Sequence, residues 1–390
     1  MHGMYVFFAV ATCIWAGAQV YMAARMTATL TGKKQRWARI GWGVLAGLAV
    51  VAMGPGRVWG GEAWFKPIVE LGYVSMGMFA ILFALLLGRD LLTLASRLPR
   101  LLGRFKERPV DQGRRRALLS GGNAMILGAT SVWTGRGMWE ASREPQVFHV
   151  RVPIAGLPQA LHGYRIAQMS DVHVGAALDG DDLATAVHHL QRLAPDLIAV
   201  TGDLVDGTVA DLAPELTSLR ELSAPDGVYF VTGNHEYYWD APAWCEHVAS
   251  LGLTVLNNAH RMVERDGARI LVAGCTDYRA ASFVPGQASD PAAARAGAPA
   301  VDLAILLAHQ PKSAFAAEAA GYDLQISGHT HGGQFFPGTL LVGLIQPFVK
   351  GLGRLRGLQV YVNRGTGYWG PPLRDIVREI TLLELVPADA

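Results

Sequence analysis

The sequence of 390 residues has few charged side chains and very little cysteine. Only 17% of its residues are Asp, Glu, Lys or Arg, against about a quarter in an average soluble domain, whereas 51% are hydrophobic and the mean hydropathy is +0.23. This balance excludes a disordered chain, which needs high charge and little apolar surface, and it argues against a purely water-soluble protein. Three cysteines cannot form a disulfide scaffold, and whether Cys245 and Cys275 pair stays open.

Acidic side chains are scarce in the first third of the chain. Residues 1–135 hold 16 lysines and arginines against 5 acidic residues, a net charge of +11, whereas residues 136–390 hold 18 against 27, a net charge of −9. The basic residues surround apolar runs, which is typical of membrane topology and not of a nucleic-acid-binding surface, so no nucleic-acid partner is expected. We therefore predict a transmembrane anchor domain over 1–135 and a globular domain over 136–390.

Long uncharged runs occur four times before residue 136. They are Met4 to Ala24, Ile40 to Gly56, Leu71 to Gly88 and Ala117 to Gly135. Each approaches the ~20 residues that a helix needs to cross a bilayer, and a backbone inside lipid must satisfy its own hydrogen bonds, so each is predicted as a helix. The fourth run is the weakest because it contains Asn123 and several glycines, and a helix that does not span stays open there. No charged residue lies deep in a run, which favours an anchor over a transporter.

Basic residues alternate between the predicted loops and give an orientation. The loops after the first and third runs are rich in lysine and arginine, whereas the loop after the second holds only Arg57 and Lys66. Because basic loops stay in the cytoplasm, four crossings would place residues 136–390 on the extracytoplasmic side. The triplet Arg114–Arg116 would anchor the fourth helix, or belong to a twin-arginine export signal with the same result. If the fourth run does not cross, the globular domain is cytoplasmic.

Short apolar runs alternate with helical patterns from about Arg151 onwards. The predicted strands are Tyr164–Met169, Leu197–Thr201, Val228–Thr232, Arg269–Ala273, Leu303–Ala308, Asp323–Ile326, Gln359–Val362 and Glu379–Leu383. Helical patterns such as Asp181–Leu193 and Pro242–Leu251 lie between several of them. This alternation indicates an α/β fold with helices covering sheets, in which the loops after the carboxyl ends of strands carry the chemistry.

Side chains that can bind metal follow five of these strands. They are Asp171 and His173, then Asp203, Asn234, His309, and finally His329 and His331. Side chains at i and i+2 of an extended segment point to the same face, so Asp171 and His173 can bind one ion together. Carboxylate, imidazole and amide groups without thiolate suit hard to borderline divalent cations. Seven ligands are too many for one ion, so the sequence predicts two ions that share a bridging carboxylate.

These motifs resemble the calcineurin-like metallophosphoesterase family over about residues 150–385. The matching segments are Asp171-x-His173, Gly202-Asp203, Gly233-Asn234-His235-Glu236, His309 and Gly328-His329-Thr330-His331. Three further segments, Gly332–Gln334, Asn363–Gly367 and Pro371–Arg374, are similar to its membrane-anchored bacterial branch, although less specifically. The resemblance implies an α/β domain of two packed β-sheets flanked by helices.

The resemblance also implies a role for each motif residue. One ion would be held by Asp171, His173 and His331, and the other by Asn234, His309 and His329, with Asp203 bridging them. His235 would bind no metal and would be the catalytic residue that protonates the leaving oxygen or stabilises the transition-state charge. Arg364 and Arg374 are candidates for binding the phosphate, and structural roles suit them equally well. Mn²⁺ is the favoured metal, with Fe, Zn or Mg as alternatives.

The resulting prediction is a multi-pass membrane enzyme with two divalent ions that hydrolyses phosphodiester, phosphomonoester or pyrophosphate bonds. The lipid bilayer as partner, together with the apolar segment Leu340–Leu352, favours a lipid or envelope substrate, because an amphipathic segment beside the site can dip into the membrane interface. A buried helix or hairpin is the alternative for that segment. A general phosphodiesterase acting on soluble esters and a catalytically silent metal-binding membrane sensor are the competing functional hypotheses.

Overall fold

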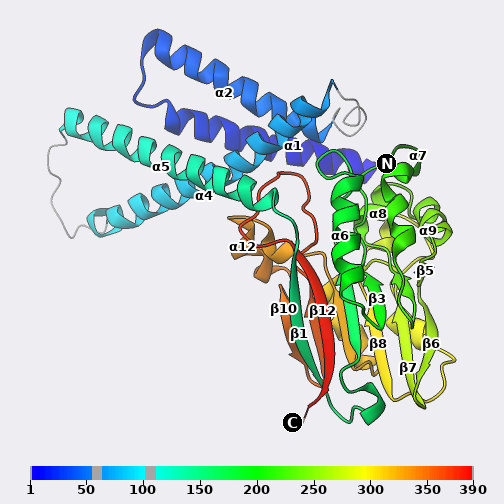
Figure 1. Cartoon of the computed structure of the whole chain (residues 1–390). Helices are drawn as coiled ribbons and strands as arrows, with labels where there is room; N and C mark the ends of the chain where they lie inside the picture. The colour runs from blue at the N-terminus through cyan, green and yellow to red at the C-terminus, as the bar shows by residue number, and fades with distance from the viewer. Residues whose placement is uncertain (1, 55–63, 102–110, 389–390) are drawn as a thin grey trace. The chain divides into compact units, whose positions relative to one another are not determined.

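The computed structural model describes residues 2–54, 64–101 and 111–388 (Figure 1). Contacts divide the chain into a helical unit, Met1–Met138, and a second unit, Trp139–Ala390. All three cysteines are free, so the pair left open by the sequence does not form.

The described residues of the first unit form four long helices. They are α1 (His2–Met26), α2 (Gly32–Met53), α4 (Lys66–Leu101) and α5 (Gln112–Ala141). The four predicted apolar runs fall on these helices, except for the end of the second run, which lies outside the described residues. Within the described part of the chain, α2 and α4 are long and apolar enough to cross a membrane. The four crossings therefore stay a prediction.

A polar network joins three of these helices. The Asp90 carboxylate accepts a hydrogen bond from the Tyr21 hydroxyl (2.8 Å) and pairs with Arg25 (2.7 Å) and Arg89 (2.8 Å). The side chain of Asn123 accepts from Arg89 (2.6 Å) and donates to the carbonyl of Arg25 (2.9 Å). The network therefore ties α5 to the end of α1 and to α4.

Two six-stranded sheets form the second unit. Their orders are β1-β12-β2-β3-β4-β5 and β10-β11-β9-β8-β7-β6. The strands are β1 (Gln146–Ile154), β2 (Arg165–Met169), β3 (Leu197–Val200), β4 (Val228–Phe230), β5 (Thr254–Val255), β6 (Ala259–Arg265), β7 (Ala268–Gly274), β8 (Leu303–Leu307), β9 (Leu324–Ser327), β10 (Gly351–Leu355), β11 (Leu358–Val362) and β12 (Glu379–Pro387). All eight predicted strands are present, and the two-sheet α/β architecture is confirmed. The prediction missed β1, β5, β6 and β10, which lie at sheet edges.

Shorter helices connect and cover the strands. The α-helices are α6 (Gly180–Arg192), α7 (Val209–Leu212), α8 (Asn234–Tyr238), α9 (Ala241–Ser250), α10 (Pro291–Arg295), α11 (Ala314–Ala319) and α12 (Gly338–Leu341). The 3₁₀ turns are η1 (Gln159–Leu161), η2 (Ala213–Glu221), η3 (Ala280–Ser282), η4 (Pro311–Ser313), η5 (His331–Gly333) and η6 (Val342–Leu344). The helical patterns predicted from the sequence correspond to α6 and α9.

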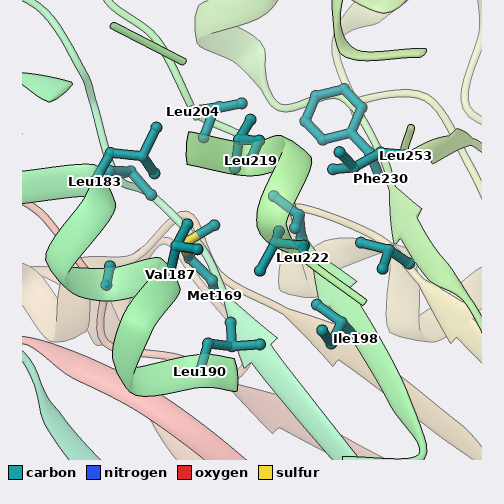
Figure 2. Close-up of a cluster of buried hydrophobic side chains, with 14 of the residues drawn as sticks. Met169, Leu183, Val187, Leu190, Ile198, Leu204, Leu219, Leu222, Phe230 and Leu253 are labelled. Atoms are coloured by element: carbon teal, nitrogen blue, oxygen red, sulfur yellow. The ribbon is translucent and has the colours of Figure 1, made fainter. Parts of the chain in front are cut away.

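One buried cluster lies between the two sheets. It combines Ile166, Ala199 and Leu383 of the first sheet with Ile270, Ile305 and Ile326 of the second. A second cluster lies under α6, where Leu183, Val187 and Leu190 pack against Met169 of β2 and Ile198 of β3 (Figure 2). Helix α6 begins at this place because Asp179 and Asp182 form a capping box. Strands β2 and β3 are therefore buried on both faces, which explains the continuous apolar sequence of β3.

Candidate metal centre

Each predicted ligand lies within four residues of the end of a strand. Strands β2, β3 and β4 are parallel neighbours in the first sheet, and β8 and β9 are parallel neighbours in the second. Because parallel strands bring their carboxyl ends to the same edge, the sheets gather residues that are far apart in the sequence.

The backbone of the site has an uncommon conformation. Asp171, His173, Asp203, His329 and His331 all have left-handed backbones, with φ between 49° and 71°. This conformation costs non-glycine residues of order 1–3 kcal/mol each, and it persists where surrounding structure holds it for function. Five such residues at one place indicate that the fold aims these side chains at a common centre.

The ligand side chains form two groups that share one carboxylate. In the first, Asp171 Oδ1 lies 3.4 Å from His331 Nε2, which is 3.1 Å from His173 Nε2. In the second, Asp203 Oδ2 lies 3.1 Å from His309 Nε2, which is 3.2 Å from His329 Nδ1. Asp203 Oδ2 is also 4.0 Å from His173 Nε2, so it stands between the groups. This arrangement coincides with the division that the resemblance implies, and the individual ligand roles stay predictions.

The residues of this centre fit divalent cations. The buried Oδ1 of Asn234 has no hydrogen-bond partner among the described residues, while its Nδ2 donates to the Tyr238 hydroxyl (3.3 Å). Nδ1 of His309 lies 2.8 Å from the carbonyl of Thr201, so this nitrogen carries the proton and Nε2 is left as a ligand atom. A buried amide oxygen without a hydrogen-bond donor is costly, and a cation at this place would satisfy it.

The protonation states of the site also suit cation binding. Burial raises the pKa of Asp203, but the neighbouring His309 and His235 outweigh burial and hold that pKa well below its usual range. Burial lowers the pKa of His329 to about 3 and that of His331 well below its usual range. At neutral pH, Asp203 is therefore ionised and both histidines are neutral, as metal ligands must be.

Glu236 organises the loops that carry the second group. Its buried carboxylate accepts hydrogen bonds from the backbone N–H groups of Gly233 (2.6 Å), Asp203 (3.0 Å) and Leu204 (2.7 Å). A side chain at Gly233 would place its Cβ 2.2 Å from Asp203 Oδ1, so only glycine allows this close approach. The motif Gly233–Glu236 thus fixes Asp203 and Asn234 relative to each other.

The catalytic candidate His235 is paired with a residue that sequence reasoning missed. Nδ1 of His235 contacts the carboxylate of Asp206, and the other oxygen of that carboxylate is 3.2 Å from His173 Nδ1. Burial lowers the pKa of His235, but Asp203 and Asp206 raise it to about 9 overall. The available signal was spacing, because Asp206 follows Asp203 by three residues in the same loop. The contact between Asp206 and His235 could not be predicted from this spacing, because it depends on the fold, which brings the loops after β3 and β4 together.

Two aromatic rings contact the buried side chain of His235, and a third lies behind one of them. The ring of Tyr238 is 4.9 Å from that of His235, the ring of Trp369 is 5.7 Å from it, and Phe283 contacts Tyr238 at 5.4 Å. The Gln334 amide holds Trp369 in place by donating to its carbonyl (3.0 Å) and accepting from its N–H (3.1 Å). The surroundings of His235 are therefore aromatic on this side.

The two arginine candidates have other partners. Arg374 is fully buried and donates to the carbonyls of Ile376 (2.8 Å) and Arg364 (2.5 Å). Arg364 pairs with Glu379 (3.1 Å) and lies over the ring of Phe148. Both guanidinium groups thus hold the loop between β11 and β12, and the geometry gives no support to a phosphate contact, which stays a prediction.

Comparison with known proteins agrees with this site. Residues 164–333 match the family model described as calcineurin-like phosphoesterase. A Danio rerio protein named "Transmembrane protein with metallophosphoesterase domain" is 36% identical over 329 residues, covering 82% of this chain and 74% of that protein. A Bos taurus protein of the same name is 35% identical over 68% of this chain and 62% of its own length. A metallophosphoesterase of Helicobacter pylori is 35% identical over 65% of this chain and 67% of its own.

One of these matches extends beyond the unit that contains the metal centre. The match to the Danio rerio protein is longer than Trp139–Ala390, so it continues into the helical unit. The chain spans between 54% and 74% of the length of the first three curated relatives.

Proposed function

This chain belongs to the calcineurin-like metallophosphoesterase family and is a metal-dependent phosphoesterase, and we propose that it acts as a multi-pass membrane enzyme on a lipid or other envelope phosphoester. The observation that supports this proposal most is the pair of ligand groups that share Asp203, with His235 beside them and held by Asp206.

Each residue has a defined task in the proposed reaction. Asp171, His173 and His331 would hold one divalent ion, and Asn234, His309 and His329 the other, with Asp203 common to both. When bound, the two ions would lower the pKa of a water molecule and neutralise charge on the phosphoryl oxygens.

His235 would act on the leaving group. Its Nε2 is 3.9 Å from Asp203 Oδ2, so its free N–H points toward the same centre while Asp206 holds Nδ1. With its pKa raised to about 9, the imidazole carries a proton at neutral pH. It can therefore donate that proton to the leaving oxygen as the P–O bond breaks, a role typically worth about 10²–10⁴ in rate.

The membrane part of the proposal rests on the helical unit. Helices α2 and α4 have the length and hydropathy to span. Asn123 of α5 lies at the level where α1 ends, and Ile126 packs on the cluster that contains Met22, one turn back along α1. These two contacts follow α1 and α5 in opposite chain directions, which supports a fourth crossing and an extracytoplasmic position of the catalytic unit, Trp139–Ala390.

A turnover assay on the purified full-length protein tests the proposed function. We expect hydrolysis of an aryl phosphodiester with added Mn²⁺, loss of that activity with a chelator, and about two divalent ions per chain by elemental analysis. Protein that binds metal but cleaves no phosphodiester, phosphomonoester or pyrophosphate with Mn, Fe, Zn or Mg would instead be a silent sensor. Equal turnover of soluble and membrane-embedded esters would favour a general phosphodiesterase.

A further inference from the structure

Large apolar side chains are exposed on the segment after the last metal-ligand candidates. We define the apolar loop as residues 338–349, which include α12 and η6. Leu340, Leu341, Leu344 and Ile345 are 70%, 53%, 80% and 67% exposed, and none of them belongs to a hydrophobic cluster within the described part of the chain. The alternative of a buried helix or hairpin for this segment is therefore wrong for these four residues.

Both ends of the apolar loop are attached to the metal centre. The hydroxyl of Thr330, which lies between His329 and His331, donates to the carbonyl of Val349 (2.5 Å). At the other end, a Cβ added to Gly333 would lie 2.5 Å from the Cα of Thr339, so the two backbones are in close contact. Whatever binds the apolar loop is thereby placed next to the ligand histidines.

The charged residues that lie nearest to the apolar loop in the sequence are basic, while two acidic residues approach from elsewhere in the chain: Asp375 accepts a hydrogen bond from the N–H of Phe336 (2.8 Å), and Glu318 pairs with Arg356 (2.9 Å). Residues 332–349 contain no charged side chain, and no acidic residue occurs between Asp323 and Asp375. Lys350, Arg354 and Arg356 follow the loop and are exposed. An uncharged apolar segment that is followed by basic residues suits the surface of a bilayer that contains anionic lipids. The apolar side chains would enter the acyl region, and the basic side chains would remain among the headgroups.

We propose that the apolar loop inserts into the surface of an anionic lipid bilayer and positions the metal centre over lipid phosphoesters. This inference rests on the proposed function and narrows its substrate class to esters whose hydrocarbon part stays in the membrane. A bilayer is favoured over a protein partner because the same chain carries helices that are long and apolar enough to span one.

Depth measurement tests the insertion directly. A nitroxide label is attached to the cysteine of Leu344→Cys in the full-length protein, whose native cysteines are replaced by alanine. The labelled protein is reconstituted in liposomes of phosphatidylcholine and phosphatidylglycerol. The matched control is Met262→Cys, at an exposed position on β6. Strand β6 and strand β10, which follows the apolar loop, form the two opposite edges of the second sheet. We expect the label at 344 to collide with lipid-soluble oxygen and to be shielded from a water-soluble nickel complex, with the reverse at 262. Equal nickel access at both sites, or shielding of 344 from both reagents by protein, would overturn the proposal.

A pair of substrates with one leaving group tests the consequence for catalysis. Hexadecyl p-nitrophenyl phosphate partitions into liposomes, whereas methyl p-nitrophenyl phosphate stays in water. In the double variant Leu344→Glu/Ile345→Glu, we expect the rate on the hexadecyl ester to fall about tenfold or more and the rate on the methyl ester to change less than about twofold. Met262→Glu should alter neither rate. An equal loss on both esters would show that the loop only supports the metal centre and would contradict the inference.

The two experiments separate the inference from the proposed function. If the wild-type protein cleaves neither ester, the proposed function fails, while the depth of the label at 344 still decides whether the loop enters the bilayer. If it cleaves both esters while the label at 344 stays in water, only the inference fails.

Discussion

The two units of this chain distribute polarity in opposite ways. In Trp139–Ala390 the apolar side chains fill the interior, and buried polar groups such as Asp171 and His309 gather at the strand ends. In the helical unit, Val20 and Met125 are exposed, while Asn123 is buried in a polar network. The first pattern is that of a fold stabilised in water. The second is expected where lipid surrounds the helices, because polar contacts then hold them together.

This contrast also explains the two kinds of buried polar residue. In the helical unit, the buried side chain of Asn123 accepts a hydrogen bond from Arg89 and donates one to the carbonyl of Arg25, so both ends of its amide are satisfied without a ligand. In the catalytic unit, Oδ1 of Asn234 has no hydrogen-bond partner among the described residues, and the Nε2 atoms of His173 and His331 face each other at 3.1 Å. A satisfied network stabilises a structure, whereas an unsatisfied one needs something else to bind. The predictions below test that difference.

Topology should give the largest, all-or-none effect. A reporter that is active only outside the cytoplasm, fused after Ala390, should be active, because the four proposed crossings would carry the catalytic unit across the membrane. The measurement is reporter activity in intact cells, with a cytoplasm-specific reporter at the same site as control. Activity of the cytoplasmic reporter alone would mean that α5 does not cross, and the substrate would then have to lie on the inner leaflet.

Removal of the shared carboxylate should have the next largest effect. Asp203→Asn should lower kcat by about 10³-fold or more and reduce metal content, because the charge common to both ions is worth several kcal/mol. Hydrolysis of methyl p-nitrophenyl phosphate and elemental analysis measure both quantities. Asp181→Asn on the exposed first turn of α6 is the control and should leave them unchanged. Full metal content in Asp203→Asn would contradict the bridging role.

Loss of the catalytic candidate should separate chemistry from metal binding. His235→Ala should keep about two ions per chain but lower kcat by about 10²-fold or more, since a general acid contributes that much. His235 lies close to His173 and Asp203, so a ligand role is the alternative. Depletion of metal in this variant would establish that alternative.

The partner of His235 should affect the pH dependence more than the rate. The charge of Asp206 raises the pKa of His235, and a general acid works only below its pKa. Activity therefore falls as pH rises through that pKa, and Asp206→Asn should move this alkaline limb to lower pH and reduce kcat about tenfold. Profiles of kcat from pH 5 to about 10 for the wild type and the variant measure the shift. If the alkaline limb of the kcat profile lies at the same pH in both proteins, a group other than His235 determines the loss of activity at high pH.

The smallest effect is expected in the helical unit. Asn123→Ala removes a buried hydrogen-bonded side chain and should destabilise the unit by about 1 kcal/mol. The rate on the soluble methyl ester should be unchanged, because that network does not belong to the metal centre. Thermal unfolding in detergent measures the change, with Ser120→Ala on the exposed part of α5 as control. Equal destabilisation by both variants would show that burial of Asn123 contributes nothing.

Prediction from the sequence succeeded where the chemistry of the side chains alone identifies the element, as it does for a continuous apolar strand. Strands such as Leu303–Leu307 are buried on both faces, so every position must be apolar and the run is visible. Edge strands were missed because polar or charged residues interrupt β1 and β6, and β10 contains two glycines. These strands are defined by pairing with a neighbour, which a local pattern does not report.

The metal-ligand candidates, the α/β class and the apolar helices were all determined by the sequence, because side-chain chemistry and short-range periodicity are local properties. The tertiary structure alone decided that Asp206 pairs with His235, that Arg374 is occupied by carbonyl groups, and that Trp369 lies beside the catalytic candidate. It also decided that Leu344 is exposed while Leu303, equally apolar, is buried. The physical reason is that burial and contact depend on what packs from elsewhere in the chain, and identical residues acquire different roles from different neighbours.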